Sequence, residues 1–423
     1  MSRQLVAIMG TKEVGMLSQT DSGSFEFRYA DGYDGIPLSL SLPVRNGAYA
    51  ERRLRPYLFG LLPDSEAVRR DIAREFDVSA NNPLALLEHI GLDCPGGVQF
   101  CTPDSVSKVL GRSSRYVSLS DEQICNRLRR LRQGPEDSWV GRGEHWSLGG
   151  NQGKFALALR EGAWCSCEGS AATTHIFKNG VLGYSLQALN EYVCMRLAAA
   201  CNLPVSRVEY RMFGDEPAIV VRCYDRAVGR EGEIARIHQE DLCQALGVMP
   251  DMKYTIDGGP GALDVVRLLS KTSRARTNVE LFTRMLFFNT LIGAPDAHAK
   301  NYSVLLGGGG DALLAPMYDV ASGLCYESMR RDGRLAMGIG GENRFGRMSR
   351  KALSKYAEGA GMRGYGFDEA WCVETMLRIA SDVIGKIGGV FDASEGLPGI
   401  EELRSRMETP ITRNFERIMA QLK

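Results

Sequence analysis

Alternating hydrophobic and polar positions dominate the beginning of the chain. The stretches QLVAIMG, GMLSQ, SFEFRYA and IPLSLSLP, all between residues 4 and 44, alternate in this way and are separated by Gly, Asp and Asn. A period of two is typical of half-buried strands, and the separating residues favour turns. We therefore predict a small sheet of short strands in this part of the chain.

Helical periodicity follows the predicted sheet. It runs through RLRPYLFGLLPDSEAVRRDIAREF, NPLALLEHIG and LSDEQICNRLRRLRQG, and Ser120 is well placed to cap the last of these helices. The next stretch, GPEDSWVGRGEH, is polar and carries glycines, so we predict a linker there.

The rest of the chain changes from strands to helices. Residues 145–235 are rich in strand patterns with one helix, SLQALNEYVCMRLAAACN, and helices dominate from residue 236 onward. The segment NVELFTRMLFFNTLIG is apolar on nearly every face, which predicts a buried central helix. We predict an α+β chain with four parts: a β-rich N-terminal subdomain (1–105), a helix and linker (106–143), a small lobe (144–235) and a helical large lobe (236–423).

Composition narrows the class of protein. Apolar residues make up 44% of the 423 positions and charged residues 24%, as in soluble globular proteins. The 51 basic residues balance the 51 acidic ones, which argues against wholesale electrostatic binding of nucleic acid. No apolar run approaches the roughly 18 residues that span a bilayer. The 11 scattered cysteines favour reduced, mostly buried thiols and a cytoplasmic protein without membrane contact.

Candidate chemistry begins in NTLIGAPDAHAKNYSVLL, residues 289–306. Asp296 and Asn301 have the D-x-x-x-x-N spacing of a phosphoryl-transfer loop, in which the Asp accepts a hydroxyl proton and the Asn reaches a magnesium ion. Alone, this spacing also fits a solvated turn between a helix and a strand. A strand, a Gly-rich turn and a second strand follow and lead to Asp319, where kinases place their second metal-binding carboxylate. The order of the three residues therefore favours a kinase.

Upstream segments supply candidate nucleotide contacts. HWSLGGNQGKFALAL is a Gly-bearing turn before a strand, and its backbone N–H groups could cradle phosphates, although an ordinary hairpin fits equally well. TTHIFK is an extended segment that ends in Lys178, which we expect to face the nucleotide phosphates. Glu191 follows on a helix and could orient Lys178, with a surface position the favoured interpretation.

Taken together, these motifs resemble the HipA family of bacterial serine/threonine kinases, which are toxins of toxin–antitoxin modules. The resemblance runs nearly end to end through PLSLSLP, FGLLPD, SLGGNQGK, TTHIFK, QEDLCQALG, KYTIDGGPG, GAPDAHAKNYSV and PMYDV. It implies a two-lobed, protein-kinase-like fold with an N-terminal β-rich subdomain. It also implies ATP and Mg²⁺ as cofactors.

The resemblance also implies roles for individual residues. Asp296 would be the catalytic base, and Asn301 and Asp319 the metal ligands. Ser147 would be the site of silencing autophosphorylation, because a phosphate adds about −1.5 to −2 charges beside a loop that holds ATP phosphates. The implied nucleotide-binding residues are Gly149, Gly150, Asn151, Gln152, Gly153, Lys154, Lys178, Arg222, Cys223, Tyr224, His298, Lys300, Asn301, Tyr318 and Asp319. The loops depart from the family pattern at Gly153, Pro295 and Ala297.

Partners are implied by the resemblance alone. They are a HipB-like helix-turn-helix antitoxin, operator DNA bound mainly through that antitoxin, and a protein substrate such as an aminoacyl-tRNA synthetase, glutamyl-tRNA synthetase above all. Two other functions stay open: a catalytically silent DNA-binding co-repressor that acts with the antitoxin, and a small-molecule kinase. The basic stretches RLRRLRQ and SKTSRARTN could touch a phosphate backbone, but solvated helix faces are the favoured interpretation.

Overall fold

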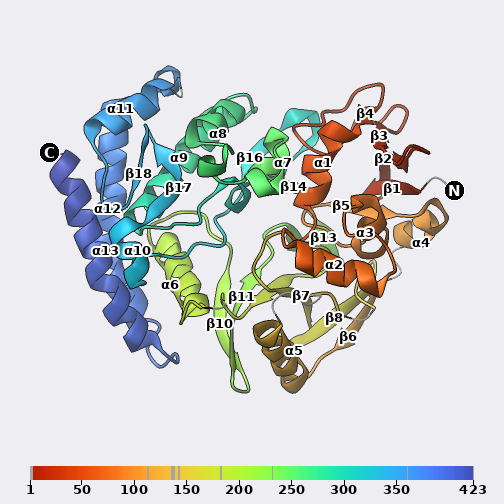
Figure 1. Cartoon of the computed structure of the whole chain (residues 1–423), viewed down its shortest axis with the longest axis horizontal. Helices are drawn as coiled ribbons and strands as arrows, with labels where there is room; N and C mark the ends of the chain where they lie inside the picture. Colours follow the sequence, from red (N-terminus) through yellow and green to blue (C-terminus); the bar gives the residue numbers. More distant parts are fainter. Residues whose placement is uncertain are drawn as a thin grey trace. The chain divides into compact units, whose positions relative to one another are not determined.

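A computed structural model describes residues 3–111, 114–134, 139–141, 143–181, 183–230, 232–359 and 361–422. The chain forms two compact units (Figure 1). The N-terminal unit comprises residues 1–182, 211–251 and 304–311, and the C-terminal unit comprises residues 183–210, 252–303 and 312–423. Part of the predicted linker, residues 135–138 and 142, lies outside the described residues.

The predicted N-terminal sheet is present and has the strand order β4-β3-β2-β1-β5, with all neighbours antiparallel. Alternation places Leu5 and Ala7 on the face that belongs to the main core, while Val6 and Ile8 pack into a smaller cluster with Val109. The elements of this region are β1 (Gln4–Met9), β2 (Lys12–Gln19), β3 (Phe25–Tyr29), β4 (Tyr49–Ala50), α1 (Glu51–Gly60), α2 (Glu66–Glu75), α3 (Pro83–Ile90), β5 (Val98–Cys101), η1 (Pro103–Ser105) and α4 (Val106–Leu110).

One predicted strand is wrong. The stretch IPLSLSLP alternates like a strand, but it forms a turn closed by an isolated bridge between Ser39 and Leu42. The hydroxyl of Tyr29 takes the place of the hydrogen bonds that a neighbouring strand would make. It accepts from the N–H of Leu38 at 2.8 Å and donates to the carbonyl of Leu42. A side chain from β3 thus satisfies backbone groups that a neighbouring strand would otherwise pair.

A second sheet in the N-terminal unit has the strand order β10-β11-β9-β7-β8-β6, and the chain returns from the C-terminal unit within β10. Phe155 of β7 and Phe177 of β9 stack with ring centroids 5.1 Å apart, in the core that also contains Leu5. Ser120 caps α5 as predicted, in a capping box with Gln123. The elements are β6 (Ser114–Ser118), α5 (Asp121–Gln133), β7 (Phe155–Arg160), β8 (Ala163–Gly169), β9 (His175–Lys178), β10 (Val208–Phe213), β11 (Glu216–Arg222), β12 (Arg226–Val228), β13 (Ile234–Arg236), β14 (Gln239–Asp241) and α7 (Leu242–Leu246).

The C-terminal unit is mostly helical and is built around α9, which is buried along most of its length as predicted. It packs against α8, α12 and α13, and Asn414 of α13 donates to the carbonyls of Thr290 and Leu291 at its C-terminal end. The elements of this unit are η3 (Thr255–Asp257), α6 (Gln187–Ala200), α8 (Ala262–Leu269), α9 (Ala275–Leu291), η4 (Ala299–Asn301), β16 (Ala312–Leu314), α10 (Glu327–Asp332), β17 (Arg334–Ile339), β18 (Glu342–Arg344), α11 (Arg350–Gly359), η6 (Met362–Tyr365), α12 (Glu369–Asp392) and α13 (Ile400–Leu422). Three short elements remain: η2 (Pro250–Met252) crosses the boundary between the units, and most of β15 (Ser303–Leu306) and all of η5 (Gly308–Gly310) belong to the N-terminal unit.

Ten of the 11 cysteines are buried, as predicted, and each carries a free thiol. Within the described ranges, no helix has the length and apolar character required to cross a membrane.

Candidate active site

The candidate catalytic loop, residues 295–301, follows the C-terminal end of α9 and is closed by its own hydrogen bonds. The carbonyl of Asp296 accepts from the backbone N–H of His298 at 2.8 Å and from Nδ2 of Asn301 at 2.7 Å. These bonds fix the base candidate and the metal-ligand candidate to each other. The side chain of Asp296 is 60% exposed, so its carboxylate is accessible to a substrate hydroxyl.

Asp319 is brought to the same loop by its neighbour. The hydroxyl of Tyr318 donates to the carbonyl of Lys300 at 2.7 Å and lies 2.6 Å from the hydroxyl of Ser303. Asp319 itself has a left-handed backbone with φ of 58°. Such a backbone is uncommon outside glycine, and it is typical of residues at functional sites.

His298 is almost fully buried and feels the charges of both Asp296 and Asp319. Burial lowers its pKa to about 4, while the negative charges of Asp296 and Asp319 act in the opposite direction. Its Nε2 is 3.6 Å from Oδ1 of Asp296, and its Nδ1 is buried without a hydrogen bond to any described residue. The ring is therefore neutral at pH 7, and both carboxylates are near enough to influence it.

The donor atoms fit a magnesium ion held together with nucleotide phosphates. Asn301 uses Nδ2 for the bond to the Asp296 carbonyl, so Oδ1 would be the atom that it offers to a metal ion, and Asp319 would offer a carboxylate. Oxygen ligands of this kind suit Mg²⁺, which needs only one or two of them when phosphates supply the rest. Among the described residues, no group of three or more His, Cys, Asp or Glu forms a complete protein cage for a metal.

Tyr254 also belongs to this site, although the sequence motifs gave it no role. Its hydroxyl donates to Oδ1 of Asp296, and its ring meets His298 edge to face with centroids 4.8 Å apart. The only signal in the sequence was its place in KYTIDGGPG, a stretch that carries the family resemblance without an assigned role.

The predicted phosphate loop lies in the N-terminal unit and is held by the FGLLPD segment. The N–H of Asp64 donates to the carbonyl of Gly150 at 2.9 Å, and the N–H of Gly150 donates to Oδ1 of Asp64 at 3.3 Å. Gly150 has φ of 98°, a conformation that favours glycine. Lys154 folds back so that Nζ donates to the carbonyl of Gly149 at 2.8 Å.

Ser147 precedes this loop and is buried. Its hydroxyl donates to the carbonyl of Leu61, and its N–H donates to the carbonyl of Asp93 at 2.9 Å. Both bonds join the segment before the phosphate loop to the N-terminal subdomain. A phosphate on this hydroxyl would remove the donor and would not fit the buried position.

Lys178 and the predicted hinge occupy neighbouring strands of the second sheet. Lys178 ends β9 opposite Ile219 of β11 and is buried. The N–H of Cys223 donates to the carbonyl of Thr174 at 2.9 Å, and the hydroxyl of Tyr224 donates to Gln239 at 2.9 Å. These bonds fix the course of the backbone from Arg222 to Tyr224.

Glu191 differs from the favoured expectation of a surface position, because it is fully buried. It lies on α6 in the C-terminal unit, and α6 is buried at most of its positions. The apolar residues around Glu191 in the sequence are what a buried helix requires, and this was the signal that the surface interpretation overlooked.

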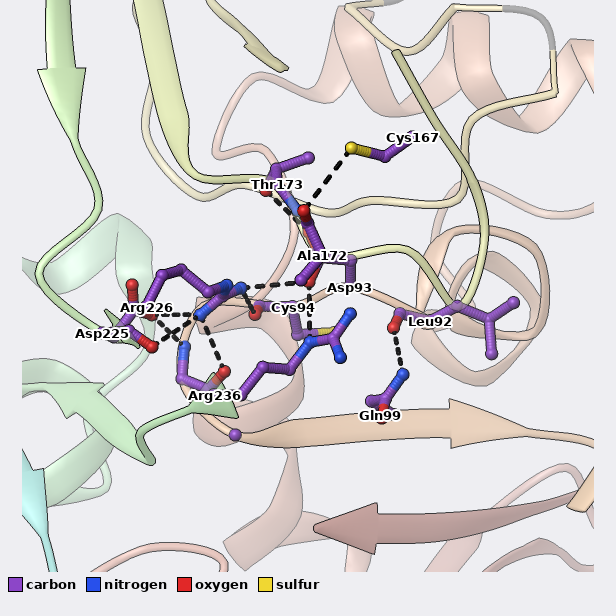
Figure 2. A network of polar contacts seen from close by, with 12 residues as sticks. Leu92, Asp93, Cys94, Gln99, Cys167, Ala172, Thr173, Asp225, Arg226 and Arg236 are labelled. Atoms are coloured by element: carbon purple, nitrogen blue, oxygen red, sulfur yellow. Dashed lines mark hydrogen bonds and ion pairs between the residues drawn. The ribbon is translucent and has the colours of Figure 1, made fainter. Parts of the chain in front are cut away.

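A buried network of charges fixes the segment that follows the hinge (Figure 2). Oδ1 of Asp93 accepts from Arg226 at 3.1 Å and from Arg236 at 2.9 Å, while Oδ2 accepts from the hydroxyl of Thr173 at 2.6 Å. Burial alone would raise the pKa of Asp93, but the two guanidinium groups hold it below its ordinary value. Asp225 adds a second carboxylate to Arg226 at 2.8 Å.

The basic stretch of α5 is occupied by ion pairs inside the N-terminal unit. Arg127 makes two short bonds to the buried Glu144, and Arg132 pairs with Glu216 at 2.5 Å. Arg129 pairs with Asp215 at 2.7 Å. The interpretation as a solvated face is wrong for Arg127, whose side chain is mostly buried over Phe155.

The predicted site residues therefore form two groups. Asp296, His298, Lys300, Asn301, Tyr318 and Asp319 share the catalytic loop and its surroundings in the C-terminal unit. Ser147, the phosphate loop, Lys178 and the hinge belong to the N-terminal unit. Each group has its own network of contacts within its unit.

Comparison with known proteins finds HipA-type domains and kinases along most of the chain. The profile described as HipA N-terminal domain matches residues 5–101, and the HipA-like C-terminal domain matches residues 146–386. The putative kinase Y4mE of Sinorhizobium fredii is 35% identical over 361 residues, covering 82% of this chain and 84% of that protein. The serine/threonine-protein kinase toxin HipA of Shewanella oneidensis is 28% identical over 387 residues, covering 88% of this chain and 86% of that one.

A solved structure extends the comparison to the fold. It contains HipA of Shewanella oneidensis with HipB and operator DNA, and it superposes with a TM-score of 0.82 at 24% identity, covering 98% of this chain and 97% of that one. The predicted fold, an α+β kinase-like chain with a β-rich N-terminal subdomain, is thereby confirmed.

Proposed function

This chain belongs to the HipA family, and from that premise we propose that it is an ATP- and Mg²⁺-dependent serine/threonine-protein kinase, the toxin of a toxin–antitoxin module. Its two curated relatives named above are called kinases, one of them a kinase toxin. The observation that carries the proposal is the catalytic loop, where the exposed Asp296 is bonded to Asn301 and shares His298 as a neighbour with Asp319.

Each residue then has a defined task in phosphoryl transfer. Asp296 accepts the proton of the substrate hydroxyl as that oxygen attacks the terminal phosphorus of ATP. Asn301 Oδ1 and the Asp319 carboxylate would hold Mg²⁺, which neutralises charge on the phosphates when bound. Lys178 and the backbone N–H groups of the phosphate loop, residues 149–154, position the phosphates. The backbone of the hinge, residues 222–224, receives the adenine.

Autophosphorylation of Ser147 would switch this kinase off. The buried hydroxyl bond to Leu61 and the paired bonds between Asp64 and Gly150 hold the phosphate loop in place. A phosphoryl group carries about −1.5 to −2 charges and takes away the donated bond. The loop would therefore leave its position against the FGLLPD segment and lose its hold on ATP.

The partners of the module follow from family membership. The proposed set comprises a HipB-like helix-turn-helix antitoxin, operator DNA and a protein substrate, for which glutamyl-tRNA synthetase is the first to test. The HipA of Shewanella oneidensis was solved with HipB and operator DNA. Because the net charge of this chain is zero, we propose that DNA is held mainly through the antitoxin, in the cytoplasm.

Incubation of the purified chain with labelled ATP and Mg²⁺ tests the proposal directly. We expect label on the wild type, none on Asp319→Asn, and much less on Ser147→Ala, which should still label an added substrate protein. Asn at position 319 keeps a residue that tolerates the left-handed backbone, so the loss reports on the carboxylate. Nucleotide binding without transfer by the wild type would contradict the proposal and favour a DNA-binding co-repressor.

A further inference from the structure

The carboxylate of Asp296 receives a hydrogen bond from outside its own loop. Tyr254 lies 42 positions earlier in the chain, just before η3, and its hydroxyl donates to Oδ1 of Asp296. Both residues belong to the C-terminal unit. Among the described residues, the hydrogen bond and the close ion contact of this carboxylate both involve Oδ1, which leaves Oδ2 to accept a proton from a substrate.

The loop that presents Tyr254 is tightly constructed. The carbonyl of Tyr254 accepts from the N–H groups of Asp257 at 3.1 Å and Gly259 at 3.0 Å. A Cβ at Gly259 would lie 1.8 Å from the carbonyl oxygen of Met252, so only glycine fits. The hydroxyl of Thr255 closes the turn by donating to the carbonyl of Pro260 at 3.1 Å. The Asp-Gly-Gly-Pro stretch thus holds the tyrosine in one place.

Several charged and titratable groups surround this contact. The ring of Tyr254 rests edge to face on the buried His298, and the ammonium of Lys253 lies 5.6 Å from the tyrosine ring. Lys300 and Asp319 act on His298 electrostatically. Of these, Tyr254 donates its hydrogen bond directly to the carboxylate of the base, whereas the ring nitrogen of His298 is 3.6 Å away.

We infer that Tyr254 is a positioning residue for phosphoryl transfer, because its hydroxyl anchors Oδ1 of Asp296 and aims Oδ2 at the hydroxyl of the substrate. The inference rests on the proposed kinase function. An exposed aspartate rotates freely about its last side-chain bond, and one donated hydrogen bond removes most of that freedom. The substrate proton then moves to Oδ2 as the new P–O bond forms, and the bond between the terminal phosphorus and the oxygen of ADP breaks.

Tyr254→Phe isolates this contact, since it removes the hydroxyl and keeps the ring against His298. At saturating ATP we expect the rate of label incorporation to fall about 10- to 100-fold, the effect of one hydrogen bond to a charged group. The ATP concentration for half-maximal rate should stay within about twofold of wild type, because Tyr254 acts on the base.

Tyr365→Phe is the matched control. Its hydroxyl donates to the carbonyl of Ser270 at 3.4 Å in the same unit, so it loses a phenol–backbone bond away from Asp296. We expect its rate at saturating ATP and its unfolding temperature to equal those of the wild type. A wild-type rate in Tyr254→Phe would overturn the inference, and so would a loss of rate accompanied by weaker ATP binding or a lower unfolding temperature. A wild type that transfers no phosphate would instead overturn the proposed function.

Discussion

Asp296 and Asp93 are two aspartates held in opposite ways, one in each unit. The side chain of Asp296 is 60% exposed, and the closure of its loop depends on Asn301, five positions away. The side chain of Asp93 is 3% exposed and binds Arg226 and Arg236, which lie 133 and 143 positions further along the chain (Figure 2).

The difference in exposure and contacts reflects the different roles of the two aspartates, one proposed to act in catalysis and the other to stabilise the fold. A base must be reached by a substrate proton, so Asp296 stays exposed and its orientation comes from few contacts. A buried carboxylate is tolerated only with charged partners and hydrogen bonds, so Asp93 has both. Replacement of the first aspartate should therefore change catalysis without changing stability, and replacement of the second should change stability above all.

The largest expected effect is on catalysis at Asp296. Asp296→Asn keeps the size of the side chain but cannot accept the substrate proton, so we expect phosphoryl transfer to slow by about 10² to 10⁴-fold. The free energy of unfolding should stay within about 0.5 kcal/mol of wild type, as for other exposed positions. Transfer of labelled phosphate and urea unfolding measure the two quantities. A variant that transfers phosphate at nearly the wild-type rate would remove Asp296 from the role of base.

The second expected effect is on stability at Asp93. Asp93→Asn places an amide where two guanidinium groups and the donors of Thr173 need a carboxylate, so Arg226 keeps only Asp225 as a charged partner. Breaking a buried ion pair in this way costs about 3–5 kcal/mol, which urea unfolding would detect as a lower midpoint.

Asp71→Asn is the matched control for that experiment. Asp71 pairs with Arg74 at 2.8 Å on the surface of α2, and such a pair contributes only about 0.2–0.5 kcal/mol. The loss of unfolding free energy should therefore be much larger for Asp93→Asn than for Asp71→Asn. Equal effects at positions 93 and 71 would mean that burial of the Asp93 network does not determine its contribution.

The parts of the site that the sequence predicted are those defined by short spacing. Asp296 and Asn301 lie in one loop, and Asn301 bonds directly to the backbone of Asp296. The buried helix before the loop and the capping of α5 by Ser120 also depend on neighbours a few positions away. Local patterns express such interactions because the residues that make them are close together in the chain.

The parts that the sequence did not predict depend on distant partners. Tyr254 meets Asp296 across 42 positions, and Asp93 meets Arg226 across 133, so no spacing rule points to either contact. The predicted strand IPLSLSLP failed for a different reason, because the side chain of Tyr29, only 9 and 13 positions away, bonds to the backbone of Leu38 and Leu42. Alternation alone could not reveal that a side chain would take the place of a neighbouring strand.

The smallest expected effect is the loss of stability at low pH that is due to one histidine of the N-terminal unit, His238. His238 is buried, with Nδ1 accepting from the N–H of Gly97 at 3.2 Å and Nε2 bonded to the carbonyl of Leu38 at 3.0 Å. Burial lowers its pKa from 6.5 to about 4. Between these two values the unfolded chain binds a proton that the folded chain excludes. The free energy of unfolding therefore falls as the pH falls, by up to about 1.4 kcal/mol per pH unit from this residue.

His238→Gln removes the titratable imidazole but keeps a donor and an acceptor for the same two backbone groups. As the pH falls from 6.5 toward 4.5, we expect the free energy of unfolding to decrease less in the variant than in the wild type. Urea unfolding at several pH values measures this difference. Part of the acid sensitivity should remain, because burial also lowers the pKa of His175 and His298 to about 4. A difference that does not depend on pH would show that His238 is not excluded from protonation in the folded chain.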